Sequence, residues 1–572
     1  MTTVATHLVQ ALVAAGVQRI YGVVGDSLNS IVDAVHHSKK IEWIHVRHEE
    51  AGAFAASAEA QLTGKLAVCA GSCGPGNLHL INGLYDAHKT LAPVLAIAAQ
   101  IPSSEIGTGF FQETHPENLF KECSHFCQLI ATEKQMPRLL QIAMQTSTSR
   151  GGVSVLVLPG DVASSEMTAK ELEHRIFHPR PAIQPASEEL QKLSYLLNNA
   201  ERATIFGGAG CVEAHEEVLM LAKLAQSPVV YSFRGKEFLE HDNPYAAGMT
   251  GLLGTESGHY ALEKADLVLM LGTDFPYTAW YPKNAKIVQI DSRAEHLGRR
   301  CKLELGLVGD TRTTIKALLP LIKPKKSSRH LKLCREKYEE TRNSLEQHAR
   351  TTKPGQPLHP EYATKVISEL ADRDAIFTVD TGMTAVWAAR YLEMQEGQRL
   401  IGSFNHGSMA NALPHAIGAQ LAFPKRQVFS LSGDGGFTML MGDILTLVQY
   451  DLPIRLVIFN NSTLGMVKLE MRVAGLEDFG VDLKPTNFAK MAEALGIRAV
   501  RIENGDDLKD SIKTALRHRG PVLLDIVTDP NALAFPPKLN AKEVAGYGLF
   551  LVKQTLHGKL FESIEDLKGN LP

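Results

Sequence analysis

The sequence predicts an α/β protein of three doubly wound parallel-sheet domains followed by a C-terminal amphipathic helical tail. Short apolar runs, typical of buried parallel strands, alternate with amphipathic stretches of helical period along most of the chain. The 572 residues exceed what a single hydrophobic core accommodates. Two breaks, one rich in proline at 178–185 and one basic and polar at 323–329, divide the chain into segments of similar layout.

The first domain, residues 1–182, contains five apolar runs that we expect to be strands of one parallel sheet. Amphipathic stretches at 28–37 and 51–62 lie between strands, which is the βαβ pattern. The proline-rich break then ends the domain. The expected strands are 19–24, 41–46, 66–70, 94–98 and 153–158.

The second domain, residues 183–334, and the third, residues 335–530, repeat this alternation. A charged helix is expected at 331–350, after the basic linker. The expected strands of the two domains are 203–206, 228–231, 267–271, 286–290, 428–432, 454–459 and 521–527.

Composition restricts the class of protein. The chain has 59 Lys and Arg residues and 62 Asp and Glu residues, for a net charge of −3. This composition lacks the excess of basic residues that is typical of proteins that bind nucleic acid. No leader pattern precedes the first helical stretch, and no uncharged apolar run reaches the ~18–20 residues of a spanning helix. Seven cysteines, an odd number and without partners at zinc-site spacing, favour reduced thiols in a cytoplasmic compartment.

The sequence Gly433-Asp434-Gly435 follows an apolar strand, and Asn460-Asn461 follows the next strand after a helix expected at 437–449. A right-handed crossover places the carboxyl ends of two such strands at one edge of the sheet. Asp434 and Asn461 are therefore expected to meet in one crevice, where a carboxylate and an amide oxygen suit Mg²⁺ and a diphosphate. The alternative is an ordinary strand-end Asp, with Asn461 as a helix N-cap.

This spacing resembles the diphosphate signature of the thiamine diphosphate (ThDP) enzymes, and the resemblance extends over nearly the whole chain. It implies that the first domain binds the aminopyrimidine, that the third binds the diphosphate, and that the Thr463 carbonyl is a third Mg²⁺ ligand. Gly407 and Ser408 offer phosphate donors before a helix expected at 410–421. Met409 matches the apolar residue under the thiazolium, although a core methionine fits the same position. The remaining cofactor-binding positions implied are Gly435, Gly436, Ser462, Leu464, Gly465, Met466 and Val467.

Glu49 stands in the sequence Arg47-His48-Glu49-Glu50, at the start of an expected helix. Such a carboxylate is often only a helix-dipole partner, and this is our interpretation of Glu50. Glu49 resembles the glutamate that hydrogen-bonds N1′ of the aminopyrimidine and so promotes loss of the proton from C2. By the same resemblance Phe111 and Gln112 face the reacting carbon, although a loop with two Phe residues also suits local packing.

The middle domain indicates which branch of the family the chain resembles. Glycine-rich turns after its strands allow backbone amides to approach phosphate, and Asp291 ends a strand where a carboxylate can bind a ribose hydroxyl. Together with Arg234-Gly-Lys-Glu237, these turns resemble the FAD-binding domain of pyruvate oxidases and acetolactate synthases. The expected FAD-binding residues are Thr250, Gly251, Leu252, Leu253, Thr273, Asp274, Phe275, Pro276, Tyr277 and Asp291.

Motifs of all three domains are similar to the quinone-linked pyruvate oxidases of bacteria. The resemblance implies a homotetramer, oxidation of pyruvate to acetate and CO2 through FAD to ubiquinone, and catalytic positions that include Met466 and Glu470. Met466 departs from the aromatic residue expected there. Two rivals are acetolactate synthase with structural FAD and a catalytically silent regulatory protein.

The tail, residues 531–572, contains apolar residues at spacings of three and four between about 542 and 567, with lysines among them. A surface helix docked on its own core and an interfacial helix share this pattern. The resemblance favours the second and implies a peripheral enzyme on the cytoplasmic side of the cell inner membrane, cytoplasmic when not bound to lipid.

Overall fold

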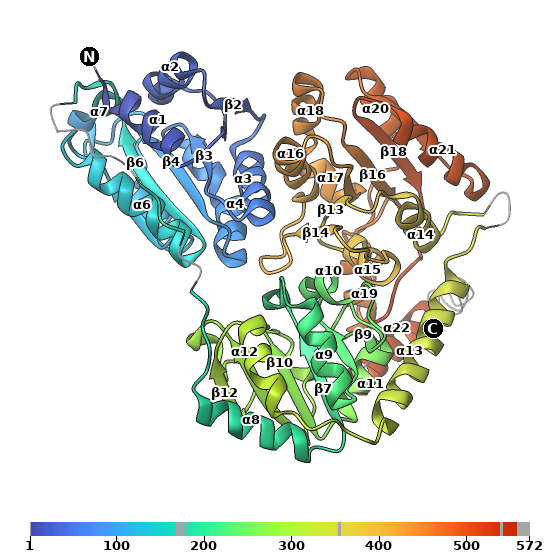
Figure 1. Ribbon diagram of the computed structural model, residues 1–572. Coiled ribbons are helices and arrows are strands. Elements are labelled where there is room, and N and C mark those ends of the chain that lie inside the picture. The colour runs from blue at the N-terminus through green and yellow to red at the C-terminus, as the bar shows by residue number, and fades with distance from the viewer. Residues whose placement is uncertain (1, 168–174, 179–180, 353–355, 538–540, 557–572) are drawn as a thin grey trace.

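A computed structural model describes residues 2–167, 175–178, 181–352, 356–537 and 541–556. It contains three six-stranded sheets, each formed within one segment of the chain, and every pairing within them is parallel. Figure 1 shows the N-terminal sheet in blue and cyan, the middle sheet in green below it, and the C-terminal sheet in orange and red beside it. The predicted fold class is confirmed, whereas the exact domain boundaries stay predictions.

The N-terminal sheet has the strand order β2-β1-β3-β4-β6-β5. Its strands are β1 (Arg19–Gly22), β2 (Glu42–His45), β3 (Ala67–Gly71), β4 (Val94–Gln100), β5 (Phe126–Leu129) and β6 (Val153–Pro159). Its helices are α1 (Val4–Ala14), α2 (Asn29–Ser38), α3 (Glu49–Thr63), α4 (Pro75–Thr90), α5 (Pro116–Leu119), α6 (Met136–Arg150) and α7 (Gly160–Ser164).

The middle sheet has the strand order β12-β11-β10-β7-β8-β9. Its strands are β7 (Ala203–Gly207), β8 (Val229–Tyr231), β9 (Ala246–Met249), β10 (Leu267–Leu271), β11 (Lys286–Asp291) and β12 (Leu305–Val308). Its helices are α8 (Ser187–Asn199), α9 (His215–Ala225), α10 (Lys236–Leu239), α11 (Glu256–Glu263) and α12 (Thr311–Leu318), and α13 (Arg329–His348) is the charged bridging helix.

The C-terminal sheet has the strand order β14-β13-β15-β16-β18-β17. Its strands are β13 (Ile376–Val379), β14 (Arg399–Gly402), β15 (Val428–Gly433), β16 (Arg455–Asn460), β17 (Arg498–Ile502) and β18 (Val522–Val527). Its helices are α14 (Pro360–Leu370), α15 (Met383–Tyr391), α16 (Ala412–Ala422), α17 (Asp434–Leu440), α18 (Ile444–Tyr450), α19 (Gly465–Val473), α20 (Phe488–Ala494) and α21 (Gly505–Arg517), and α22 (Ala541–Leu556) follows in the tail.

In each sheet the chain winds in opposite directions from one pair of neighbouring strands, and the carboxyl ends of those two strands form a crevice suited to a ligand. The reversal lies between β1 and β3, between β7 and β10, and between β13 and β15. In the third sheet the crevice is flanked by Asp380, directly after β13, and by Asp434, directly after β15. The topology thus selects the region that carries the predicted metal motif.

The N-terminal and C-terminal domains share one hydrophobic core. Helices α3 and α4 cover one face of the N-terminal sheet and pack against α16, and apolar residues of both domains belong to the same buried cluster. The helices α3 and α16 approach so closely that a Cβ atom on Gly418 would lie 2.1 Å from the carbonyl oxygen of Ala55. The two domains therefore form one packed unit, with the middle domain below them (Figure 1).

Two helix predictions were wrong in detail. The expected helix at 437–449 is two helices, α17 and α18, joined by a 3₁₀ turn at Met441–Asp443 that contains Gly442, a poor helix former. The helix expected from residue 410 begins at Ala412, because Ala410 has a φ of +65°, which an α-helix excludes.

The tail contains α22, which packs on α19. Its inner face buries Tyr547 and Phe550, whereas Val544, Leu549 and Val552 are more than half exposed. The remainder of the predicted tail helix, from residue 557 on, lies outside the described residues. No helix in the described part of the chain has the length and apolar character needed to cross a bilayer.

Candidate active site

The C-terminal crevice is organised around the Asp434 carboxylate, at the start of α17. Its Oδ1 accepts the amide of Gly435 at 2.8 Å, and its Oδ2 accepts the amide of Ser462 at 2.6 Å. Burial raises the pKa of Asp434 to about 6, against the opposing effect of these amide donors. The side-chain oxygen of Asn461 accepts the amide of Thr463 at 3.1 Å. The structure therefore brings together the sequence motifs that lie on either side of β16.

These residues supply the hard oxygen atoms that Mg²⁺ prefers, namely a carboxylate, an amide oxygen and a backbone carbonyl. The Thr463 carbonyl accepts the amide of Gly465 at 3.0 Å and retains a second lone pair. A cavity of about 430 Å³ adjoins the group, and its lining includes Asn461, Ser462 and Thr463. The chemistry of the donor set and the adjoining space fit a metal-bound diphosphate.

Asp380 is a residue of this crevice that the sequence interpretation missed. Its side chain is 1% exposed, and a Cβ atom on Gly436 would lie 2.2 Å from its Oδ2, so only glycine fits there. Burial raises the pKa of Asp380 to about 7. Its Oδ1 accepts the backbone and side-chain amides of Asn411, at 3.1 and 3.0 Å. The available signal was its position in Val379-Asp380-Thr381-Gly382, directly after a strand.

The loop before α16 lies against the same motif. A Cβ atom on Gly435 would contact the side chains of Leu464 and Met409, at 2.5 and 3.7 Å. Gly407 has a φ of +80°, and the Ser408 amide donates to the Ser403 hydroxyl at 3.1 Å. The predicted diphosphate loop and the predicted thiazolium residue are thus neighbours in space.

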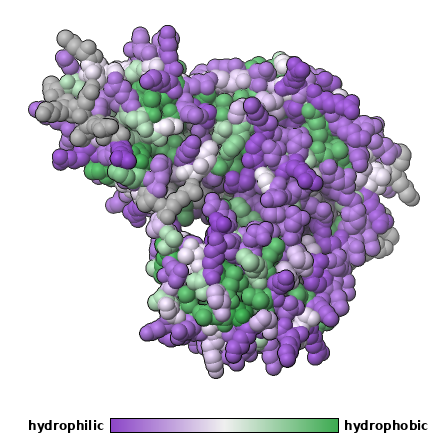
Figure 2. Space-filling view, in the orientation of Figure 1, coloured by the Kyte–Doolittle hydropathy of each residue, from purple (hydrophilic) through white to green (hydrophobic). Residues whose placement is uncertain are grey.

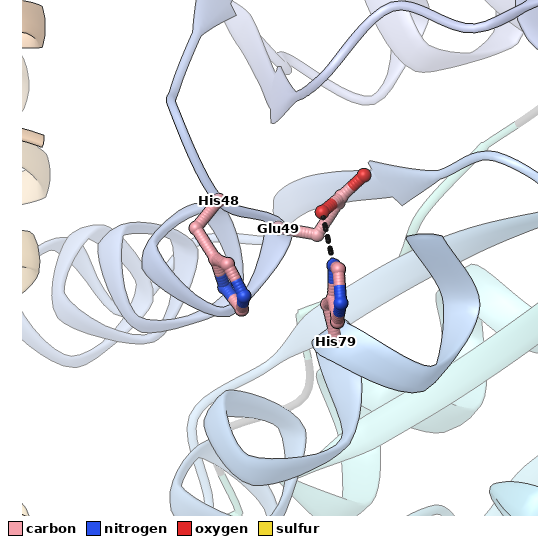
Figure 3. Close-up of side chains that lie close together, drawn as sticks. All are labelled: His48, Glu49 and His79. Atoms are coloured by element: carbon pink, nitrogen blue, oxygen red, sulfur yellow. Dashed lines mark hydrogen bonds and ion pairs between the residues drawn. The ribbon is translucent and has the colours of Figure 1, made fainter. Parts of the chain in front are cut away.

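Glu49 begins α3 and is 7% exposed (Figure 3). Its Oε2 lies 2.9 Å from Nδ1 of His79, on α4, and the rings of His48 and His79 stack at 4.2 Å. One ligand atom from each of the three residues lies within 4.8 Å of the others, although no ion is present. His79 was not among the predicted site residues. It lies within the glycine-rich motif Gly71–Leu84, and a histidine there was the signal that could have found it.

The glycine-rich turn before α4 closes around Glu49 and Gln112. A Cβ atom on Gly76 would lie 3.0 Å from Oε1 of Glu49, and one on Gly74 would lie 2.9 Å from the Cβ of Gln112. The Cys73 thiol lies 3.4 Å from Oε1 of Gln112. Phe111, in contrast, is 78% exposed. The structure therefore groups Gln112 with Glu49 and leaves Phe111 at the surface.

Three residues of the candidate site have a strained backbone conformation. Among the described residues, nine non-glycine residues have positive φ, and three of them, Gln112, Ala410 and Ser462, belong to the candidate site. Such conformations cost of order 1–3 kcal/mol each and persist only where the surroundings enforce them. The strain supports a functional constraint on these loops.

Helix α19 carries the predicted residues of the substrate side. Gly465 packs against Met383, and Met466 is half-buried against the C-terminal core. Val467 is 40% exposed, and Glu470 is exposed one turn further on. Among the described residues, no hydrogen bond or ion pair joins Glu470 to the Asp434 group.

The two halves of the site are connected by Asn82, on α4. Its Nδ2 donates to Oε1 of Glu50 at 2.7 Å and to the Ser408 hydroxyl at 2.8 Å. In the part of the chain that the structure describes, no hydrogen bond or ion pair joins Glu49 itself to the Asp434 group. Glu50 thus has a hydrogen-bond partner in Asn82.

The middle domain offers a second crevice, between β7 and β10. A Cβ atom on Gly208 would lie 2.6 Å from the Thr273 side chain, and one on Gly210 would lie 2.6 Å from Gly272. The segment Gly207–Gly210 was not predicted, and its signal was a glycine pair directly after a strand. Thr250 is 2% exposed, and its hydroxyl has no hydrogen-bond partner. An orphaned buried hydroxyl beside glycine-lined strand ends fits a dinucleotide.

The other predicted FAD residues lie around this crevice. Gly251 has a φ of +100°, and a Cβ atom at this position would contact the rings of Phe275 and Tyr277. Leu252 and Pro276 belong to the same two loops, and the Leu253 carbonyl accepts Nε of Arg390 at 3.3 Å. Two carboxylates already have partners. Asp274 pairs with Arg299 and Arg300, each at 3.0 Å, and Asp291 accepts the amide of Arg293 at 2.9 Å and lies 3.2 Å from His296.

Comparison with known proteins agrees with this layout. Three family descriptions of thiamine pyrophosphate enzymes match the chain: the N-terminal TPP binding domain over residues 2–119, the central domain over 190–318, and the C-terminal TPP binding domain over 380–526. The matches follow the three sheets in order.

Three relatives align over nearly their full length. A putative thiamine pyrophosphate-containing protein, YdaP, of Bacillus subtilis is 34% identical over 97% of this chain and 96% of its own. Pyruvate oxidase of Lactiplantibacillus plantarum is 31% identical over 91% and 87%, respectively. A probable acetolactate synthase large subunit of Methanocaldococcus jannaschii is 30% identical over 92% of both chains. The chain therefore belongs to the thiamine pyrophosphate enzyme family and is a ThDP-dependent enzyme.

Proposed function

We propose that the protein oxidatively decarboxylates pyruvate to acetate and CO2 and transfers the two electrons through FAD to ubiquinone. The balanced reaction is pyruvate, water and ubiquinone to acetate, CO2 and ubiquinol. The observation that carries the proposal is an apolar seam between the middle and C-terminal domains. Leu253 of the predicted FAD loop and Met466 of α19 both pack against one buried cluster, and Phe233 contacts Phe404 at 4.4 Å. This seam supports a flavin that lies beside the reacting cofactor rather than remote from it.

Bound ThDP would supply a nucleophilic carbon and an electron sink, and bound FAD would accept the electron pair. Asp434, Asn461 and the Thr463 carbonyl would hold Mg²⁺, with Gly407, Ser408 and 435–436 around the diphosphate. Glu49 would hold a proton opposite the aminopyrimidine, and its low exposure of 7% would exclude water from that contact. His79, 2.9 Å away, would orient the Glu49 carboxylate.

The tail supports a membrane-bound acceptor. Three apolar side chains of α22, Val544, Leu549 and Val552, are more than half exposed, whereas Lys553 donates to the Gly475 carbonyl at 2.7 Å. An exposed apolar stripe supports reversible binding to a lipid interface, where ubiquinone resides. The proposed location is therefore peripheral, on the cytoplasmic side of the inner membrane.

Deletion of the chain after Pro530 tests the role of the tail. Liposome binding and ubiquinone reduction should be lost, while reduction of a small water-soluble acceptor by pyruvate should persist. If both activities fall together, the docked α22 is required for the fold. If neither falls, the membrane role is wrong.

The proposal includes a homotetramer. On the face shown in Figure 2, apolar surface is gathered over the middle domain, at the bottom of the view. Exposed large apolar residues of this domain include Tyr195 at 69% and Val212 at 51%. Apolar patches of this kind commonly mark protein interfaces. Light scattering of the purified protein would give the assembly size.

Acetolactate synthase is the second candidate, because relatives with that name align over 92–93% of this chain. The two candidates differ in product. Purified enzyme with ThDP, Mg²⁺, FAD and pyruvate should form acetate and reduce ubiquinone or a dye in equal amounts. Acetolactate without acceptor reduction would replace the proposal with the synthase. The absence of any pyruvate turnover would favour a regulatory protein.

A further inference from the structure

A continuous chain of buried polar side chains crosses the shared core of the N-terminal and C-terminal domains. Its members are Asp380, Asn411, His415, Asp86 and Ser57, and each is at most 1% exposed. The surrounding cluster is otherwise apolar. Polar groups in such a place are costly unless each finds a partner, and when connected they fix one arrangement.

The orientation of Asn411 follows from its partners. Its Nδ2 donates to Oδ1 of Asp380 at 3.0 Å and to the Ser408 carbonyl at 2.8 Å. Its Oδ1 therefore faces donors: the Ser403 amide at 3.1 Å and Nδ1 of His415 at 3.0 Å. This arrangement requires a hydrogen on Nδ1 of His415.

His415 continues the chain into the other domain. Its Nε2 lies 3.3 Å from Oδ2 of Asp86, and the Ser57 hydroxyl donates to the same oxygen at 2.9 Å. Both ring nitrogens of His415 therefore face acceptor atoms. The edge of the ring packs against Phe54, with 5.4 Å between ring centroids. The histidine is thus held by both domains.

The two ends of the chain reach the two halves of the candidate site. Asp380 contacts the Gly436 position of the metal motif, and Asn411 directly precedes α16. Ser57 lies on α3, the helix that begins with Glu49, and Asp86 lies on α4, the helix that carries His79. A second, shorter path runs through Asn82, on α4, which donates to Glu50 and to the Ser408 hydroxyl.

We propose that this chain couples the loop at 407–412 to helices α3 and α4, with His415 as the central positioning residue. It keeps the diphosphate loop in one position relative to the helices that carry Glu49 and His79. The inference rests on the proposed roles of Asp434 and Glu49. Coupling free energies between sites are typically equivalent to about 5–150-fold in affinity, and the effect is reciprocal.

The test compares variants at opposite ends by two readouts that do not involve quinone. Asp86→Asn, in the N-terminal domain, should raise the dissociation constant of ThDP about tenfold at saturating Mg²⁺. Asp380→Asn should slow C2 hydrogen–deuterium exchange about tenfold in enzyme saturated with ThDP, although Glu49 is intact. In the double variant each readout should change by about the same factor as in the more affected single variant, because either substitution removes a carboxylate from the same chain.

Tyr450→Phe is the matched control. Its hydroxyl accepts the amide of His45 at 2.8 Å and donates to the Trp43 carbonyl at 3.0 Å, so it is another polar contact between the same domains. It should leave both readouts within about twofold. Ser57→Ala, which removes the hydrogen bonds of the Ser57 hydroxyl with Asp86 and Gln61, should weaken ThDP binding roughly threefold if Asp86→Asn does not fold.

Several outcomes would overturn the inference. Effects that multiply in the double variant would show independent sites, and equal effects of Tyr450→Phe would show general loosening of the interface. Unchanged ThDP affinity in folded Ser57→Ala would also contradict it. Failure of wild-type enzyme to reduce ubiquinone would reject the proposed function alone, since neither readout depends on the acceptor.

Discussion

The docking of α22 on α19 depends on the close approach of Gly546 to the backbone of α19. A Cβ atom at Gly546 would lie 2.2 Å from the Val473 carbonyl oxygen and 3.1 Å from the carbonyl carbon of Ala474. These are backbone atoms, which cannot rotate away. The first distance is about 1 Å shorter than the ~3.5 Å of ordinary non-bonded packing. Gly546→Ala should therefore separate the two helices.

The expected magnitude follows from the cost of overpacking, about 1–3 kcal/mol, which corresponds to about a 5–150-fold increase in the open population. The opposing contacts are those of Phe550 under the Arg472 guanidinium at 5.1 Å, Lys553 with the Gly475 carbonyl at 2.7 Å, and Tyr547 with Phe535 at 5.3 Å. Hydrogen exchange of the α22 amides, followed by mass spectrometry, measures the opening directly.

Gly548→Ala is the control, because its Cβ position has no neighbour within 4 Å. Alanine there should favour the helix by about 0.5–1 kcal/mol and slow exchange. If α22 leaves α19 to reach lipid, Gly546→Ala should also bind liposomes at lower lipid concentration than wild type. Equal exchange rates in the two variants would refute the docked position of the tail helix.

Three further predictions concern single side chains. Glu49→Gln should retain ThDP but slow C2 exchange about 10²–10⁴-fold, whereas Glu50→Gln, which keeps its Asn82 contact, should not; unchanged exchange in the first would reject the role of Glu49. Asp434→Ala should weaken ThDP binding at low Mg²⁺, whereas the control variant Asp451→Ala should not. If Asp434→Ala binds ThDP as tightly as wild type, another residue holds the Mg²⁺ and diphosphate. Burial raises the pKa of Glu361 to about 7, and its Oε2 has no hydrogen-bond partner. Because the folded pKa lies above the unfolded value, the protein loses stability as pH rises from about 4.5 to about 7. Glu361→Gln should therefore be more stable than wild type by about 1–3 kcal/mol at pH ~8 but not at pH ~4.5 in thermal melts, and a pH-independent difference would contradict this.

Most interior strands were predictable from the sequence because they are short, continuous apolar runs, although the interior strand β13 (Ile376–Val379) was missed. Edge strands such as β5, β9 and β12 were not predictable, since they are short and partly polar or adjoin glycine. Their existence depends on pairing with a neighbour that lies far away in the sequence.

The closeness of Asp434 and Asn461 could be predicted because each residue directly follows one of two successive strands. Asp380 could not, because its role depends on packing against Gly436, more than fifty residues later. His79 likewise acquires a partner only when α3 and α4 lie side by side. The break between α17 and α18 was missed because helical periodicity continues through the 3₁₀ turn.

Anaerobic mixing of the FAD-loaded enzyme with pyruvate, followed by ubiquinone, tests the central claim most directly. The absorbance of oxidised flavin should disappear on addition of pyruvate, return in full when ubiquinone is added, and leave one acetate for each flavin cycle. Flavin that stays oxidised while pyruvate is consumed and acetolactate accumulates would contradict the account.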